Sequence, residues 1–150
     1  MRLAAPTEFE YCTTVRYVEV DSQGVVFNAW YLTYCDEAMT AYLHARGLPY
    51  SDLLKAGFDT QLVHATIDWK SSLRWQDGVR VAVSAGAAGR TSFTMDFVVR
   101  RQDGRVACSA QIEYVVVAAG GSGKREIPSL LRPALSGPPV QDPQPESRVV

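Results

Sequence analysis

The chain has 150 residues, of which 47% are hydrophobic and 21% are charged, a length and composition that suit one globular domain. Fifteen basic and sixteen acidic side chains leave a net charge of -1, which excludes a chain-wide attraction to nucleic acid or to an anionic membrane. Three widely spaced cysteines form no metal-binding pattern, and no apolar stretch resembles a signal peptide or a membrane span. We therefore expect a cytoplasmic protein with reduced thiols.

The first half of the chain predicts a strand followed by a long helix. Residues 9–20 are rich in Tyr, Thr and Val, which favours a strand. A helix is predicted to begin at Asn28, which can cap it. Gly47 ends this helix after Arg46, and Pro49 prevents it from continuing. Apolar side chains cover most of this helix and its polar residues form one narrow stripe, so we expect other structure to surround it.

Four further strands are predicted after a polar link, at residues 60–71, 79–86, 91–101 and 105–118. Apolar and polar residues alternate along them, and Asp103-Gly104 marks a hairpin turn. This order gives the α+β class, with one long helix packed on a curved, mainly antiparallel meander. An exposed edge of such a sheet favours a homodimer.

The end of the chain has a different composition. Residues 136–150 are rich in proline and polar residues, which cannot bury enough apolar surface to offset the entropy of ordering. We predict a folded domain over residues 1–135 and a disordered tail behind it.

Asp21 stands between the first strand and the helix, in the run VEVDSQGVVFNAWYL, and two interpretations of it stay open. An aspartate shortly before a glycine commonly forms an Asx turn. The segment that follows Asp21 is too apolar for a surface loop, however, and it leads directly to the helix, whose first N–H groups can stabilise an oxyanion. A carboxylate beside such groups is suited to acyl transfer.

Several segments resemble the 4-hydroxybenzoyl-CoA thioesterase family, which has the hotdog fold. DSQGVVFNAWYLTYCDEA resembles its D-x-x-G-x-V-x-x-x-x-Y-x-x-x-x-(D/E)-x-A signature, and DWKSSLRWQDGVRV, GRTSF and KREIPSLLRPAL resemble later segments in the same order. The resemblance implies a helix wrapped by a five-stranded sheet and hydrolysis of a thioester of CoA or of an acyl carrier protein. It implies that no metal or cofactor is needed. It also implies that the sites are built across a homodimer, with a dimer of dimers as the larger alternative.

The resemblance also implies roles for single residues. Asp21 is the catalytic carboxylate, as nucleophile or general base, and the helix N-terminal amide that binds the thioester carbonyl falls on Asn28, where relatives often carry His or Tyr. The oxyanion- and acyl-binding residues are predicted at Gly24, Val26, Phe27, Asn28 and Tyr31, with His64 lining the acyl pocket. The turn that meets the phosphates and pantetheine arm of CoA is predicted at Arg90, Thr91 and Ser92.

Glu37 is a reserve catalytic acid, because some other hotdog thioesterases carry their acid on this helix, although charged stripes usually face water. Two other functions stay open. One is an acyl-thioester binding protein that has no turnover. The other is a hotdog dehydratase or hydratase, which needs a histidine base, and the sequence places neither His44 nor His64 near Asp21.

Overall fold

The computed structural model describes residues 9–121 and 123–136. Strand β1 (Phe9–Thr14) is followed by helices α1 (Trp30–Ala45) and α2 (Tyr50–Lys55). Four strands then complete the sheet: β2 (Phe58–Trp69), β3 (Gly78–Ala88), β4 (Ser92–Arg101) and β5 (Val106–Ala118). Short 3-10 turns lie at Tyr17–Glu19 and Arg132–Leu135.

The sheet has the strand order β1-β3-β4-β5-β2, and all four neighbouring pairs are antiparallel. The predicted meander is therefore right for β3, β4 and β5 and wrong for β2, which pairs with β5 at one edge. Residues 70–77 carry the chain across the end of the sheet from β2 to β3. The Lys70 and Ser71 N–H groups donate to the Ala107 carbonyl on the way, at 2.8 and 3.2 Å.

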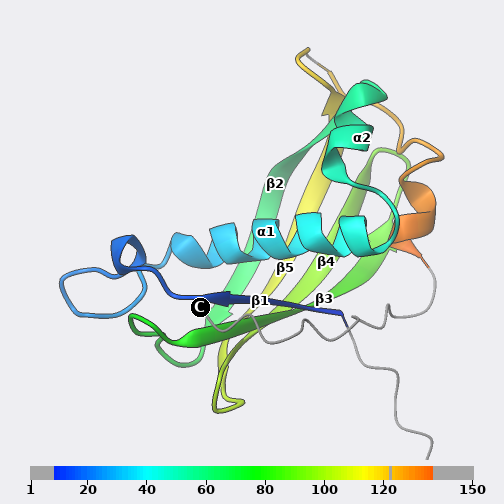
Figure 1. Ribbon diagram of the computed structural model, residues 1–150. Helices are drawn as coiled ribbons and strands as arrows, with labels where there is room; N and C mark the ends of the chain where they lie inside the picture. The colour runs from blue at the N-terminus through cyan, green and yellow to red at the C-terminus, as the bar shows by residue number, and fades with distance from the viewer. Residues whose placement is uncertain (1–8, 122, 137–150) are drawn as a thin grey trace, which may run out of the picture.

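Helix α1 lies across one face of the sheet (Figure 1). Its buried side chains are Tyr31, Tyr34, Cys35, Ala38, Met39, Tyr42 and Leu43. These side chains pack on the sheet. Every second residue along β4 and β5 is buried there, as the alternation in the sequence predicted. Each large apolar side chain buried in this way contributes about 1.5–3 kcal/mol, so the helix face and the sheet face hold each other in place.

The first strand is shorter than predicted. β1 ends at Thr14, because the next backbone groups find partners outside the sheet. The Val15 N–H donates to the Asp77 carbonyl at 2.9 Å, and the Arg16 N–H donates to the Glu19 carboxylate at 2.8 Å. Residues Tyr17–Glu19, which were predicted as part of the strand, therefore form a 3-10 turn.

The polar link after α1 contains a helix that the sequence prediction missed. α2 begins after Pro49, with Asp52 in its first turn and Lys55 in its last, and its buried residue is Leu53. Gly47, with φ +85°, ends α1 as predicted. Within the described ranges, no helix has both the length and the apolar character needed to cross a bilayer. The predicted tail falls almost entirely outside the described residues.

Candidate active site

Asp21 lies at the tip of a short hairpin formed by residues 19–27. Backbone hydrogen bonds join Phe27 to Glu19 and Asp21 to Val25, each at 2.9 Å. The Asp21 side chain is half-buried, and its Oδ1 accepts the Gln23 N–H at 2.8 Å. The Asx turn, which was one of the two interpretations of Asp21, is therefore present. The second carboxylate oxygen accepts no hydrogen bond from the part of the chain that the structure describes.

Glu19, two residues before Asp21, anchors this hairpin to α1. It is only 2% exposed, and Tyr34 of the helix donates a hydrogen bond to its Oε1 at 2.7 Å. The Arg16 Nε donates to Oε2 at 2.9 Å. Burial, together with the hydrogen bond to Glu19, raises the pKa of Tyr34, so its hydroxyl stays protonated as a donor. The sequence analysis did not single out Glu19.

The segment before β3 holds the other side of the hairpin. The Val26 N–H donates to the Leu73 carbonyl at 2.9 Å, and Val25 forms an antiparallel bridge with Arg74. Gly24 closes the hairpin with φ +77°, and a Cβ added at this position would lie 3.9 Å from the Arg74 guanidinium. The hairpin is thus fixed between α1 and residues 73–74.

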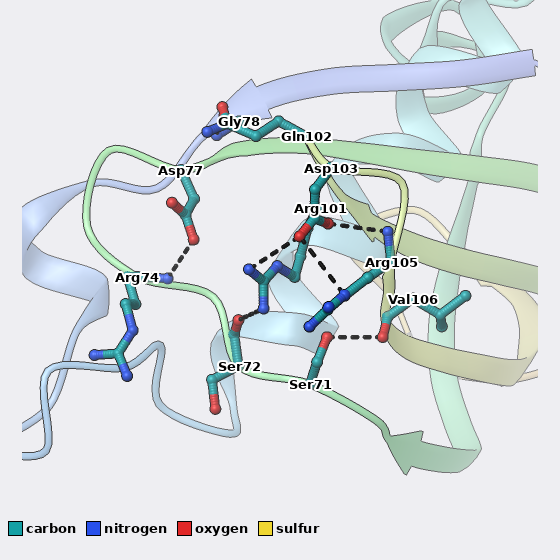
Figure 2. Close-up of polar contacts among 10 residues, drawn as sticks. All are labelled: Ser71, Ser72, Arg74, Asp77, Gly78, Arg101, Gln102, Asp103, Arg105 and Val106. Atoms are coloured by element: carbon teal, nitrogen blue, oxygen red, sulfur yellow. Dashed lines mark hydrogen bonds and ion pairs between the residues drawn. The ribbon is translucent and has the colours of Figure 1, made fainter.

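Figure 2 shows how Ser71 and Ser72, which precede this segment, contact the β4–β5 hairpin. The Ser71 hydroxyl donates to the Val106 carbonyl at 2.8 Å. Arg101 donates to the Ser72 carbonyl at 3.5 Å and pairs with Asp103 at 3.1 Å. The segment that leads from β2 to β3 is therefore held against the β4–β5 hairpin at its start.

Two amide groups at the start of α1 have no acceptor in the described chain. The N–H groups of Trp30, Tyr31 and Leu32 donate to carbonyls three residues earlier, at 3.0 to 3.4 Å. Among residues 9–121 and 123–136, nothing accepts the N–H groups of Asn28 and Ala29. Unpaired amides at a helix N-terminus carry partial positive charge and can bind a developing oxyanion.

The predicted cap at Asn28 is wrong. Ala29 is the N-cap residue, and its side chain makes no capping hydrogen bond. The tight turn of residues 27–32 already uses the N–H groups that a capping side chain would accept. The exposed Asn28 therefore contributes its backbone to this end of α1.

A pocket of about 180 Å³ opens further along α1, between this helix, α2 and the strands β2 and β5. Its lining residues are Asp36, Met39, Thr40, Tyr50, Thr60, Leu62 and Tyr114. Tyr114 donates to the Asp36 carboxylate at 2.7 Å. Burial raises the pKa of both Tyr114 and Tyr50, so each keeps its hydroxyl proton. The sequence analysis missed this pocket, because its residues come from four separate elements.

The other predicted site residues are scattered. Phe27 is 51% exposed, whereas Val26 and Tyr31 are buried in the core. His64 is exposed on β2 and does not line the pocket. Glu37 faces β1 and accepts a hydrogen bond from the Tyr11 hydroxyl at 2.9 Å.

The predicted CoA-binding turn lies far from Asp21. Arg90 and Thr91 lie in the turn between β3 and β4, and Ser92 begins β4, at the opposite end of the sheet from the 19–27 hairpin (Figure 1). The 11 residues of β3 separate the two regions, which is about 30 Å of strand. Arg90 is exposed and forms an ion pair with Glu126 at 3.0 Å. Within a single chain, Arg90 and Asp21 therefore lie far apart.

Comparison with known proteins decides the family. The model of the thioesterase superfamily matches residues 23–108, more than half of the chain. The chain belongs to the thioesterase superfamily. A relative from Synechococcus elongatus, named 1,4-dihydroxy-2-naphthoyl-CoA hydrolase, is 29% identical and is matched over 60% of this chain and 68% of its own.

Two solved structures agree with the fold. The structure of a gentisyl-coenzyme A thioesterase superposes with a TM-score of 0.76 at 28% identity, over 83% of this chain and 99% of that one. A hypothetical protein from Aquifex aeolicus superposes with a TM-score of 0.79 at 26% identity, over 85% and 99% of the two chains. The predicted hotdog fold and the predicted class of enzyme, a thioester hydrolase, are confirmed.

Proposed function

We propose that the chain hydrolyses a thioester of CoA, or of an acyl carrier protein, with Asp21 as the catalytic carboxylate. The observation that carries this proposal is the pair of unpaired amides, Asn28 and Ala29, at the base of a hairpin whose tip holds Asp21. The relatives support CoA as the thiol, because two of them are named for CoA thioesters of hydroxylated aromatic acids. The 4-hydroxybenzoyl-CoA branch of the superfamily is one candidate within this class.

The anchoring of the hairpin supports the same role. Tyr34 of α1 donates a hydrogen bond to Glu19, so the base of the hairpin that carries Asp21 is held against the helix. We place the thioester carbonyl between the carboxylate and the two amides, with its oxygen toward the amides.

The chemistry then follows in two steps. As a general base, Asp21 takes a proton from a water whose oxygen attacks the carbonyl carbon, while the amides bind the oxyanion. Collapse of the tetrahedral intermediate breaks the carbon–sulfur bond and releases the acid and the thiol, which takes the proton. As a nucleophile, Asp21 would instead attack the carbonyl carbon and expel the thiolate to form a mixed anhydride, which water then hydrolyses to release the acid and regenerate the Asp21 carboxylate.

Replacing the carboxylate tests the assignment. Asp21→Asn keeps an oxygen for the Asx turn and removes the base, so kcat for aryl-CoA hydrolysis should fall roughly 10²- to 10⁴-fold. The measurement is thiol release under saturating substrate.

Asp103→Asn is the matched control, because Asp103 makes the same kind of turn by accepting the Arg105 N–H at 3.0 Å. It should retain activity to within a few-fold. If both variants behave alike, Asp21 is only a turn residue. Tight CoA-thioester binding without any thiol release would instead favour a binding protein.

A homodimer would complete the site. We propose that the β2 edges of two chains pair, because β2 is a 12-residue edge strand with exposed Leu62, Val63 and Trp69. Such an edge seeks a partner strand. Antiparallel pairing would carry the Arg90 turn of one chain toward the Asp21 hairpin of the other, so that Arg90, Thr91 and Ser92 could hold the CoA phosphates.

A further inference from the structure

The turn between β3 and β4 lies beside the segment that follows β5, and main-chain hydrogen bonds hold the two together. The Arg125 N–H donates to the Val116 carbonyl at 2.9 Å, and the Ile127 N–H donates to the Arg90 carbonyl at 2.8 Å. The Ile127 side chain is buried in the core, which anchors the segment. The backbone therefore places Glu126, which lies between these two contacts, next to Arg90.

The side chains of these two neighbours form an ion pair. Arg90 Nη1 donates to Glu126 Oε1 at 3.0 Å, and the two side chains are 77% and 69% exposed. Among residues 9–121 and 123–136, no other acidic side chain forms an ion pair with Arg90. Glu126 is thus the counter-ion of the residue that we expect to hold the CoA phosphates.

The turn does not need this ion pair to keep its shape. The Gly89 N–H donates to the Ser92 carbonyl at 2.8 Å, and the Arg132 guanidinium donates to the Gly89 carbonyl at 3.1 Å. Both contacts hold the turn by its backbone. Removing the Glu126 charge should therefore free the Arg90 guanidinium and leave the turn in place.

Glu126 is the one acid in a basic stretch of sequence, residues 123–136. Lys124, Arg125 and Arg132 of this stretch are exposed, and none of them pairs with an acidic side chain in the described part of the chain. Clustered cations of this kind attract anions. An anion that reaches Arg90 meets a carboxylate there.

A phosphate group has the advantage over this carboxylate. Glu126 contacts the Arg90 guanidinium through one oxygen and one nitrogen. A phosphate presents two oxygens in the geometry that the guanidinium fork binds in parallel, and such bidentate pairs are stronger than single contacts. Like charges also repel, so Glu126 and a phosphate do not share the guanidinium at low cost.

We propose that Glu126 competes with the phosphates of CoA for Arg90, and that the substrate binds by displacing it. The inference rests on the proposed thioester hydrolysis, in which Arg90 holds these phosphates. It adds a specificity-determining residue, because the competition acts only on thioesters that carry a phosphate. Glu126 therefore raises the KM for such substrates, while the pantetheine arm keeps it away from the reacting carbon.

Removal of the competing charge tests the proposal. Glu126→Gln keeps the size of the side chain and should lower the KM for benzoyl-CoA roughly 2- to 5-fold, as expected when an exposed ion pair no longer has to be broken. The benzoyl thioester of N-acetylcysteamine, which has no phosphate, should show no such change. Glu10→Gln is the matched control, because Glu10 is an acid that pairs with Arg80 at 3.8 Å, and it should leave both values as they are.

The sign of the effect separates competition from support. If Glu126 held Arg90 in place for the phosphates, Glu126→Gln would raise the KM for benzoyl-CoA, and the proposal would be wrong. An unchanged KM would also contradict it. A fall of the same size in Glu10→Gln would point to net charge and overturn the role of Glu126.

Binding of CoA itself separates this inference from the proposed function, because calorimetry gives its dissociation constant without turnover. Glu126→Gln should tighten CoA binding in the wild-type background, and it should have little effect in an Arg90→Ala background. If no thioester is hydrolysed, the proposed function fails, and this pattern of binding would still establish the competition. If thioesters are hydrolysed but Glu126→Gln changes CoA binding equally in both backgrounds, the competition for Arg90 is refuted.

Discussion

Glu19 is the residue on which the geometry of the candidate site most depends. Its carboxylate accepts hydrogen bonds from Arg16 and from Tyr34, and its carbonyl accepts the Phe27 N–H. A buried carboxylate is costly to leave unpaired. These three partners together lock the base of the Asp21 hairpin against α1.

Glu19→Gln should lower both stability and turnover. The amide keeps the size of the side chain but loses the charge that strengthens three hydrogen bonds, two from Arg16 and one from Tyr34, so we expect the free energy of unfolding to fall by about 1.5–3 kcal/mol. Urea unfolding measures this change, and thiol release measures activity. Glu10→Gln is the control, because Glu10 makes only a surface ion pair with Arg80 at 3.8 Å, and its loss should cost less than about 0.5 kcal/mol.

Asp21 could be selected from the sequence and Glu19 could not, for a physical reason. A glycine three residues later and an apolar helix beyond it set Asp21 apart from a surface acid. Glu19 lies in a β-branched run where an acid ordinarily faces water, and its burial depends on a tyrosine 15 residues away. Contacts at such a distance leave no periodic signal in one sequence.

At the scale of elements, α1 and the alternation of β4 and β5 were predictable because each buries one regular face. The position of β2 in the sheet was not predictable, because the apolar pattern of a strand does not indicate which neighbouring strand it pairs with. α2 has only six residues, too few for a periodic signal, although Pro49, Asp52 and Lys55 mark its ends. The pocket was missed for the same reason, because it exists only where these elements meet.

The hairpin of residues 19–27 requires glycine at its turn, which gives a test at this scale. Gly24 has φ +77°, a conformation that costs other residues about 1 kcal/mol. Gly24→Ala should lower stability by about that amount and also reduce kcat, because the turn carries Asp21. Thermal unfolding and thiol release give the two readouts.

Gly104→Ala is the matched control for this test. Gly104 has φ +86° in the β4–β5 hairpin, and a Cβ there would meet nothing within 4 Å. The stability loss should be similar and the activity unchanged. Equal losses of activity in both variants would show that the effect is one of stability alone.

For the whole molecule, the decisive feature is the separation of Asp21 from Arg90 along β3. If a substrate spans both, it must contact two chains. Asp21→Asn and Arg90→Ala chains, each impaired alone, should then complement each other when mixed and refolded together. With random pairing, about half of the dimers are heterodimers, and each heterodimer has one of its two sites intact. Activity at low substrate should therefore recover to about a quarter of wild type.

The outcome separates shared sites from sites within one chain. Activity no higher than the average of the two separate variants would show that each chain holds its site alone. Light scattering on the same samples checks that dimers have formed.

The long, apolar edge of β2 has a practical consequence for anyone who handles the protein. If the β2 edges pair as proposed, a chain separated from its partner by dilution or by an interface mutation would present an unpaired strand on which further strands could stack. We expect monomeric preparations to lose material to turbid, β-rich deposits on storage, and concentrated ones to keep better.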